Sequence, residues 1–194
     1  MKHAGLITAL LIAATTAVAT AYGHTAARPT SALCGGSLWQ LKTLSDPGRT
    51  TVRLASATTT IGAIGERPYP RPVPTKRRTA FQRQTWEVVA QLTAYRLEAG
   101  GVRLVLFDAD SYMNAVIPLP GCLSARTRAR DQIGAAWTQF SVDCARPKTE
   151  WESLGAIVYI RGVGFWSQRR GLRGAAPNGA ELHPVTGFRI VAGC

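Results

Sequence analysis

The sequence predicts a mainly β domain of five strands and one helix, preceded by an irregular N-terminal extension. Three observations lead to this class. Glycine and proline clusters divide the chain into short segments, as they do at turns. Apolar residues recur at helical spacing within residues 125–140. Strand patterns, some alternating with period two and some apolar on both sides, occupy residues 84–95, 102–107, 112–117, 156–165 and 180–191.

Residues 1–21 have the pattern of a secretory signal peptide. Lys2 supplies a positive start, residues 6–18 are apolar and uncharged, and Ala19-Thr20-Ala21 fits the small-residue cleavage rule. The apolar run is too short to span a bilayer. We therefore expect a secreted or periplasmic protein of about 170 residues after processing, with no stable membrane insertion. The alternative is a buried N-terminal helix.

Residues 22–83 are predicted to form the extension, and residues 84–194 the main domain. Short strands are expected near Trp39 and over residues 51–54. Prolines at every second position of residues 68–74 favour an extended polyproline segment and exclude a helix. The basic run Lys76-Arg77-Arg78 that follows is predicted to be an exposed linker, with polyanion contact as the alternative.

Four cysteines remain after the predicted signal: Cys34, Cys122, Cys144 and Cys194. An even number in an exported chain indicates two disulfides, and four cysteines allow three pairings among which the sequence does not choose. Our working prediction is Cys34–Cys122 with Cys144–Cys194. A zinc site is not expected, because the chain has no CxxC pair and His183 is the only histidine in the main domain.

The predicted elements of the main domain follow one another closely. Residues 98–101 and Asp108-Ala109-Asp110 supply turns between the first three strands. Arg126, Arg128 and Arg130 are expected in the first turns of the helix, where they oppose its dipole. The fourth strand is apolar on both sides, which predicts burial. An arginine-rich loop and the turn Pro177-Asn178-Gly179 then lead into the last strand.

This order of elements resembles the OB-fold, a small five-stranded Greek-key barrel, over residues 84–191. In that fold, ligands lie across strands two and three, between the first and last hairpin loops. The resemblance therefore implies a ligand surface that includes Arg103, with Tyr112 and Asn114 nearby. Its walls would be residues 98–101 and the arginine loop.

Three segments also resemble a family of exported bacterial proteins that has no assigned reaction: CGGSLWQLKTLSD, LTAYRLEAGGVRLVLFD and GAAPNGAELHPVTGF. The last is the most specific. That family usually carries a histidine where this chain has Arg103, and a His-Gly pair where this chain has Arg170-Gly171. If those histidines serve metal binding or acid–base chemistry in relatives, the resemblance implies that this chain has lost that role.

The formal net charge of +12 favours binding of nucleic acid, anionic glycans or other polyanions. The leading hypothesis is a binding module whose arginines contact phosphates or sulfates while aromatic rings stack on bases or sugars. No catalytic residue, metal site or cofactor is predicted. The candidate ligand-binding residues are Arg103, Tyr112, Asn114, Arg169, Arg170, Arg173 and His183.

Two alternatives stay open. A secreted, divalent-ion-dependent nuclease would need carboxylates for the metal, and Asp108, Asp110 and Glu181 are the candidates. A periplasmic or cell-surface scaffold would instead bind other proteins through the proline segment and the barrel, because such a fold does not by itself imply a nucleic-acid ligand.

Overall fold

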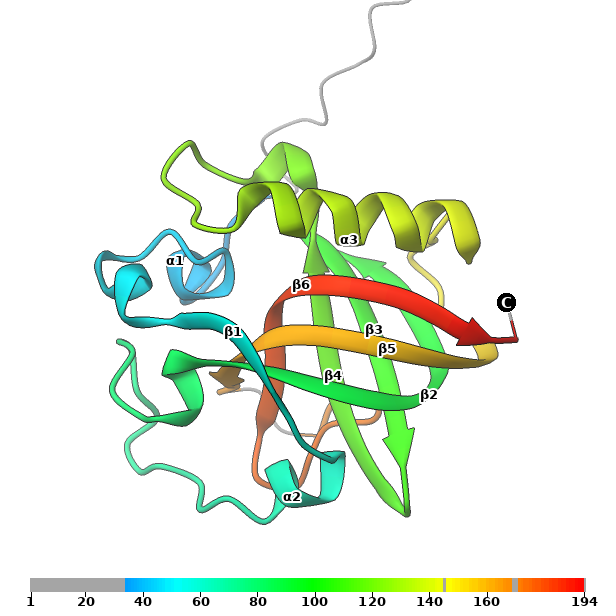
Figure 1. Ribbon diagram of the computed structural model, residues 1–194, viewed down its shortest axis with the longest axis horizontal. Coiled ribbons are helices and arrows are strands. Elements are labelled where there is room, and N and C mark those ends of the chain that lie inside the picture. Colours follow the sequence, from blue (N-terminus) through cyan, green and yellow to red (C-terminus); the bar gives the residue numbers. More distant parts are fainter. Residues whose placement is uncertain (1–33, 145, 169–170, 194) are drawn as a thin grey trace, which may run out of the picture.

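The computed structural model describes residues 34–144, 146–168 and 171–193 (Figure 1). They form a mainly β domain, so the predicted class is confirmed. The predicted signal peptide lies outside the described residues, as do Arg169, Arg170 and Cys194. The strands and helices are α1 (Trp39–Lys42), η2 (Pro47–Thr51), β1 (Arg53–Thr58), α2 (Ile61–Gly65), η3 (Phe81–Arg83), β2 (Gln84–Glu98), β3 (Gly101–Asp108), β4 (Ser111–Pro118), η4 (Pro120–Cys122), α3 (Arg130–Asp143), β5 (Glu152–Trp166) and β6 (Ala180–Ala192).

The strands form one six-stranded sheet in the order β1-β2-β3-β4-β6-β5, and β2 also pairs with β5. The pairings of β2, β3, β4, β6 and β5 therefore close into a ring. Most are antiparallel, but β4 and β6 run parallel through Asn114↔Glu181 and Ala115↔Leu182. The sixth strand, β1, comes from the N-terminal extension and pairs in parallel with β2. The five strands predicted for the main domain are thus joined by β1, near the short strand that was predicted over residues 51–54 of the extension.

The predicted helix is α3, which comes between β4 and β5 in the chain. It extends over the upper part of the sheet in Figure 1. It begins at Arg130, so Arg126 and Arg128 precede it and do not occupy its first turns as predicted. Arg128 instead donates hydrogen bonds to the carbonyl oxygens of Arg49 and Val52 at 2.7 and 2.8 Å. Among the described helices, none is long and apolar enough to cross a membrane.

The main core lies between α3 and the inner face of the sheet. The helix contributes Ile133, Ala136 and Phe140, three of the residues that were predicted to share one face. The Phe140 ring meets Tyr95 and Phe188 edge-on, with centroids 5.2 and 5.5 Å apart. Alternate residues of the strands complete this core, which explains the period-two pattern in the sequence. Fully buried examples are Leu92, Leu104, Leu106, Met113, Ile117, Ile160 and Leu182.

The N-terminal extension packs against the same sheet. A strand was predicted near Trp39, but this prediction is wrong, because the segment forms the short helix α1. The reason is tertiary packing: Leu41 is buried, and the Trp39 ring lies so close to Gly100 that a Cβ atom there would be 2.3 Å away. The second predicted strand, over residues 51–54, corresponds to β1 but begins at Arg53 and continues to Thr58.

The basic run at residues 76–78 is not uniformly exposed, and the prediction is wrong for Arg77. This guanidinium is buried and lies 3.0 Å from the carboxylate of Asp46. It also donates hydrogen bonds to the carbonyl oxygens of Leu41 and Gln82. Burial lowers the pKa of Arg77, although the charge of Asp46 opposes that shift. Arg77 therefore joins α1, the turn before η2 and η3, while Lys76 and Arg78 remain exposed.

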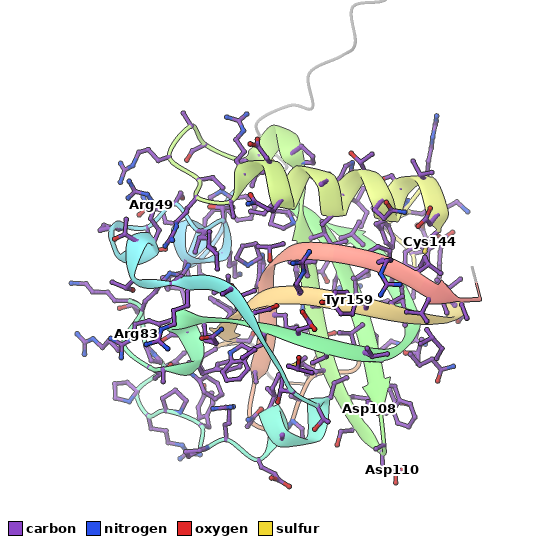
Figure 2. The ribbon with its side chains drawn as sticks, viewed as in Figure 1. Arg49, Arg83, Asp108, Asp110, Cys144 and Tyr159 are labelled. Carbon is purple, nitrogen blue, oxygen red and sulfur yellow. A yellow bond between two sulfur atoms is a disulfide. The ribbon has the colours of Figure 1, made fainter. Side chains whose placement is uncertain are left out.

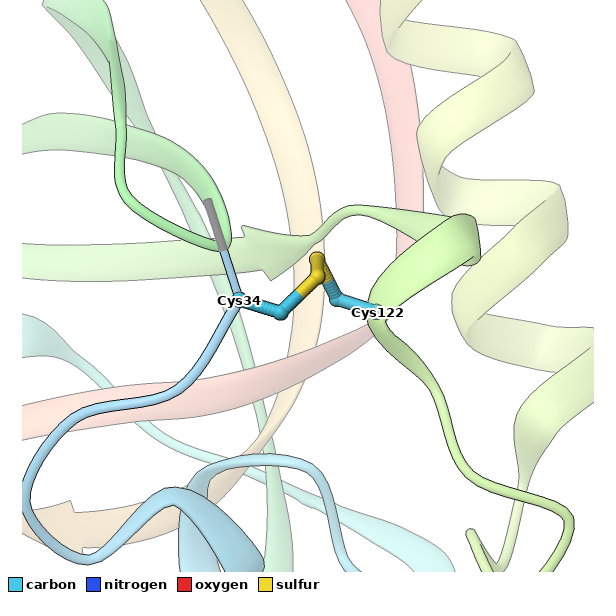
Figure 3. Close-up of a disulfide and its surroundings, with 2 residues drawn as sticks. All are labelled: Cys34 and Cys122. Carbon is cyan, nitrogen blue, oxygen red and sulfur yellow. A yellow bond between two sulfur atoms is a disulfide. The ribbon is translucent and has the colours of Figure 1, made fainter. Parts of the chain in front are cut away.

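The Cys34–Cys122 disulfide, predicted from the sequence, is confirmed (Figure 3). It links the start of the described chain to η4, across 88 residues of sequence. Cys144 is buried at the end of α3, as labelled in Figure 2. Its predicted partner Cys194 lies outside the described residues, so the second pairing stays a prediction.

Candidate functional site

A pocket of about 410 Å3 lies beside the β2–β3 turn. We call it the polar pocket. One wall is the segment of residues 35–39, whose tryptophan packs against Gly100. Another wall is the turn itself, and a third is formed by Ser167 and Gln168 at the start of the β5–β6 connection. The pocket thus lies between the first and last hairpin loops of the strand ring, where the sequence led us to expect a ligand.

The buried lining of the polar pocket contains a network of ion pairs. Arg103 on β3 donates from Nε to Glu98 at 2.8 Å and from Nη1 to Glu181 at 3.1 Å. Arg96 pairs with the other oxygen of Glu98 at 2.6 Å. Burial opposes the charge of Arg103, but the carboxylates of Glu181 and Glu98 outweigh it and raise the pKa of this residue. The positive charge of Arg103 is therefore neutralised within the protein.

His183 is the most unusual residue of this lining. It is 4% exposed, and neither ring nitrogen has a hydrogen-bond partner within the described part of the chain. Nδ1 lies 4.0 Å from a Glu181 oxygen, and the ring meets Phe165 edge-on at 5.6 Å. Burial, followed by the positive charges of Lys42, Arg103 and Arg77, lowers the pKa of His183 well below its ordinary value. The imidazole is therefore neutral at neutral pH.

The predicted residues on β4 lie elsewhere. Tyr112 is 44% exposed and packs against Phe107, with ring centroids 4.7 Å apart. Both lie near the tip of the β3–β4 hairpin, where Figure 2 places Asp108 and Asp110. Asn114 is fully buried, and neither atom of its side-chain amide has a hydrogen-bond partner among the described residues. The structure therefore brings Arg103 and His183 to one pocket, without Tyr112.

Arg173 does not line the polar pocket, but it contacts the same tryptophan ring as Arg96, which does. Its guanidinium carbon lies 5.2 Å from the centre of the Trp151 ring. Arg96, which lines the pocket, lies 4.6 Å from the same ring. Cation–π contacts of this kind fix the position of a guanidinium but leave its edge able to donate hydrogen bonds. The other two arginines predicted in this loop are outside the described residues.

A second concavity, of about 500 Å3, was not predicted from the sequence. We call it the arginine cleft. Arg53, Arg67 and Arg83 line it together with Trp86, and no carboxylate does so. The Arg67 guanidinium lies 4.4 Å from the centre of the Trp86 ring, and its buried Nε has no hydrogen-bond partner among the described residues. Arg53 and Arg83 are exposed, the latter as labelled in Figure 2.

The arginine cleft escaped prediction because its residues are distant in sequence. Arg53 comes from β1 and Arg83 from η3, and the parallel register Arg53↔Gln84 places them side by side. Arg67 follows α2 and directly precedes the predicted polyproline segment of residues 68–74. No local pattern marks three arginines spaced in this way. The one available signal was their number, 23 lysines and arginines against 11 acids in the whole chain.

The carboxylates proposed for a metal-dependent nuclease do not form one site. Within residues 34–144, 146–168 and 171–193, no three His, Cys, Asp or Glu side chains are grouped so that they could hold a metal ion. Asp110 is exposed and Asp108 half-buried at the hairpin tip, whereas Glu181 is buried against Arg103. Asp110 also has a φ of 69°, a turn conformation in which Asp is common for backbone reasons.

No family model matches the chain, and no curated protein sequence matches it significantly. Several solved structures show weak similarity, among them two aminoacyl-tRNA synthetases. One is a candidate aspartyl-tRNA synthetase from Leishmania major Friedlin, with 12% identity, a TM-score of 0.43, and coverage of 75% of this chain and 22% of that chain. The other is an asparaginyl-tRNA synthetase from Pyrococcus horikoshii complexed with asparaginyl-adenylate, with 11% identity, a TM-score of 0.37, and coverage of 64% and 23%. This chain spans less than a quarter of either, and such similarity carries no functional inference.

Proposed function

We propose that this protein is an exported binding module for polyanions, built on an OB-like Greek-key barrel. A barrel is a sheet whose first and last strands pair with each other. The closed series of pairings among β2, β3, β4, β6 and β5 therefore supports the barrel. Single-stranded nucleic acid and anionic glycans are the ligand classes, since both carry rows of negative groups along a flexible chain. The contact surface in this proposal is the arginine cleft.

The observation that carries the proposal is a set of three arginines without carboxylate partners. Arg53, Arg67 and Arg83 form no salt bridge within the described part of the chain, unlike Arg77, Arg96 and Arg103. A guanidinium presents donors in a planar fork that matches phosphate and sulfate oxygens.

Trp86 gives the cleft an ordered centre. Its ring lies against Arg67, and its Nε1 donates to the carbonyl oxygen of Phe81 at 3.0 Å. The ring is therefore fixed, and it holds one guanidinium in place before any ligand binds. A cation that is already positioned loses less conformational entropy on binding than a free one. The net charge of +12 adds long-range attraction for anions.

Export rests on the sequence pattern of residues 1–21 and is supported by the disulfide. Disulfides persist in oxidising compartments and are rare in the cytosol, and Cys34 follows shortly after the predicted cleavage site. Expression in a secreting bacterial host, followed by mass spectrometry of the exported product, tests this proposal. We expect loss of about 21 residues; an unprocessed chain retained in the cytosol would contradict it.

Fluorescence anisotropy of a labelled single-stranded oligonucleotide tests polyanion binding. The titration is run at about 50 and 150 mM salt, with and without magnesium, and with heparin as a competing glycan. The triple variant Arg53→Gln/Arg67→Gln/Arg83→Gln should bind about tenfold or more weakly. Its affinity should also depend less on salt. The slope of log affinity against log salt concentration should become shallower by about 2, because each of three lost phosphate contacts contributes about 0.7 on a single strand.

The matched control is Arg126→Gln/Arg130→Gln/Arg146→Gln, which removes the same charge from three exposed arginines outside the cleft. It should bind nearly as well as the unchanged protein. Equal losses in both triple variants would show that net charge, not the cleft, drives binding. Cleavage of the oligonucleotide with magnesium would favour the nuclease, and no binding to oligonucleotide or heparin at low salt would favour the protein scaffold.

A further inference from the structure

The polar pocket contains binding groups that the polyanion proposal does not use. Its volume of about 410 Å3 falls within the range that holds small organic ligands. An extended polymer would bind along an open surface, but this pocket is closed on one side by Trp39 against Gly100. Its two aromatic side chains, Trp39 and Phe165, can contact the apolar face of a small molecule. The pocket therefore suits a compact ligand.

His183 indicates where a polar group of that ligand would bind. The side chain lines the pocket, is 4% exposed, and has two ring nitrogens without hydrogen-bond partners among the described residues. Buried polar atoms are nearly always paired in folded proteins, because an unpaired group loses its water without compensation. A ligand atom beside the imidazole would satisfy one of these nitrogens. The buried histidine thus points to a ligand with a hydrogen-bonding group.

The charges around the pocket favour a negative group. Three cations line it, Lys42, Arg96 and Arg103, against two carboxylates, Glu98 and Glu181. Both carboxylates accept hydrogen bonds from arginine, so neither is left to hold a ligand cation. Lys42 and Arg103, two of the positive side chains that lower the pKa of His183, also line the pocket. An anionic group next to the imidazole would therefore be attracted.

The solvent-facing part of the pocket lining contains uncharged polar side chains. Ser37, Thr149 and Gln168 are exposed and line the pocket. Hydroxyl and amide groups of this kind bind the hydroxyls of a ligand by hydrogen bonds and fix its orientation.

We propose that the polar pocket binds a small hydroxylated organic anion, a sugar acid or a sugar phosphate, with its anionic group against His183 and Lys42. Sugar acids and sugar phosphates share the same recognised chemistry, an oxyanion attached to a polyol. This site is separate from the arginine cleft and does not depend on polyanion binding.

NMR of the histidine side chain tests the proposal with the intact protein. His183 is assigned by comparison with the His183→Gln variant, and the probes are gluconate, glucose 6-phosphate, inorganic phosphate and neutral glucose. Gluconate or glucose 6-phosphate should shift the His183 signals in a saturable way. The probe that binds more tightly shows whether the ligand's anionic group is a carboxylate or a phosphate. Glucose and inorganic phosphate should each bind about tenfold or more weakly, because each lacks one half of the recognised chemistry.

Two variants and one control complete the test. His183→Gln and Lys42→Gln, each checked for folding by thermal denaturation, should weaken binding of the stronger probe by about tenfold, as measured by calorimetry. Arg53→Gln, in the arginine cleft, should leave that affinity unchanged. The proposal is overturned if neither organic anion shifts the His183 signals at millimolar concentration, if glucose binds equally well, or if both folded pocket variants retain full affinity.

Discussion

Arginine and tryptophan side chains line both the polar pocket and the arginine cleft, but the arginines of the two regions differ in burial and in partners. In the polar pocket, the side chain of Arg103 is 7% exposed and pairs with two carboxylates. In the arginine cleft, Arg53 and Arg83 are exposed, and the described residues offer them no salt bridge. One region therefore neutralises its arginine internally, and the other presents positive charge to the solvent.

The difference follows from the cost of removing charge from water. A buried guanidinium without a partner is strongly unfavourable, so a buried arginine needs carboxylates fixed around it. An exposed guanidinium stays hydrated and needs no partner. Arg103 was predicted as a ligand contact because of its place on a strand, yet its donors are directed at Glu98 and Glu181. Capacity for polyanions is instead expected where exposed arginines lie together without acids.

The largest expected effect on stability comes from breaking the ion pairs of Arg103 with Glu98 and Glu181. Arg103→Met leaves the carboxylates of Glu98 and Glu181 without their shared cation, and we expect it to lower the free energy of unfolding by about 3–5 kcal/mol. Urea denaturation measures this value. The control Arg53→Met removes an arginine of the cleft and should change stability by less than about 0.5 kcal/mol. Similar losses in the two variants would refute the contrast between the regions.

Removal of the disulfide should separate the two regions functionally. Cys34 begins the segment that forms one wall of the polar pocket, whereas the arginine cleft contains no part of that segment. Cys34→Ser/Cys122→Ser should lower the free energy of unfolding by about 2–4 kcal/mol. Under conditions where the variant stays folded, binding of the small anion should weaken and oligonucleotide affinity should not. Calorimetry and anisotropy check this, and an equal loss at both sites would contradict it.

Acid should destabilise the fold through the polar pocket. Burial, then the positive charges of Lys42, Arg103 and Arg77, hold the pKa of His183 below its ordinary value. The unfolded chain therefore binds this proton more readily, so stability is retained above a pH of about 6.5 and falls as the pH drops below it. The slope is at most about 1.4 kcal/mol per pH unit. Urea denaturation between pH 7.5 and 5.5 should show a smaller slope for His183→Gln than for the unchanged protein.

The smallest effect concerns the geometry of the arginine cleft. Arg67→Lys keeps the charge but removes the planar group that stacks on Trp86. We expect oligonucleotide affinity to fall about threefold to tenfold, with the salt dependence nearly unchanged because the number of cations is the same. Anisotropy at several salt concentrations measures both quantities. Unchanged affinity would mean that the cleft acts through charge alone.

Local pattern predicted the elements of the main domain well. The alternation in β2 and the spacing of Ile133, Ala136 and Phe140 on α3 correspond to buried faces in the structure. The same reasoning failed in the extension, where Trp39 lies on a helix because its ring packs on Gly100. Short segments hold too few residues to show a period, so contacts with distant parts of the chain decide their conformation.

The candidate sites were less predictable than the strands. Arg103 and His183 were singled out in the sequence and do line one pocket, but their pairing and burial depend on Glu98 and Glu181, which the topology brings to them. The arginine cleft had no local sequence signal, only the excess of basic residues in the whole chain. It exists because β1 pairs in parallel with β2, which no local pattern encodes.

The sequence by itself determined the mainly β class, the order of strands and helix from residue 84 onward, the cysteine inventory and the excess of positive charge. These are properties of composition and of short-range periodicity. Tertiary structure alone decided which arginines are neutralised and which face solvent, because that depends on carboxylates from remote segments and on access to water. Whether a charge is structural or available for binding is therefore fixed by the fold, since the free energy of a charge is set by its surroundings.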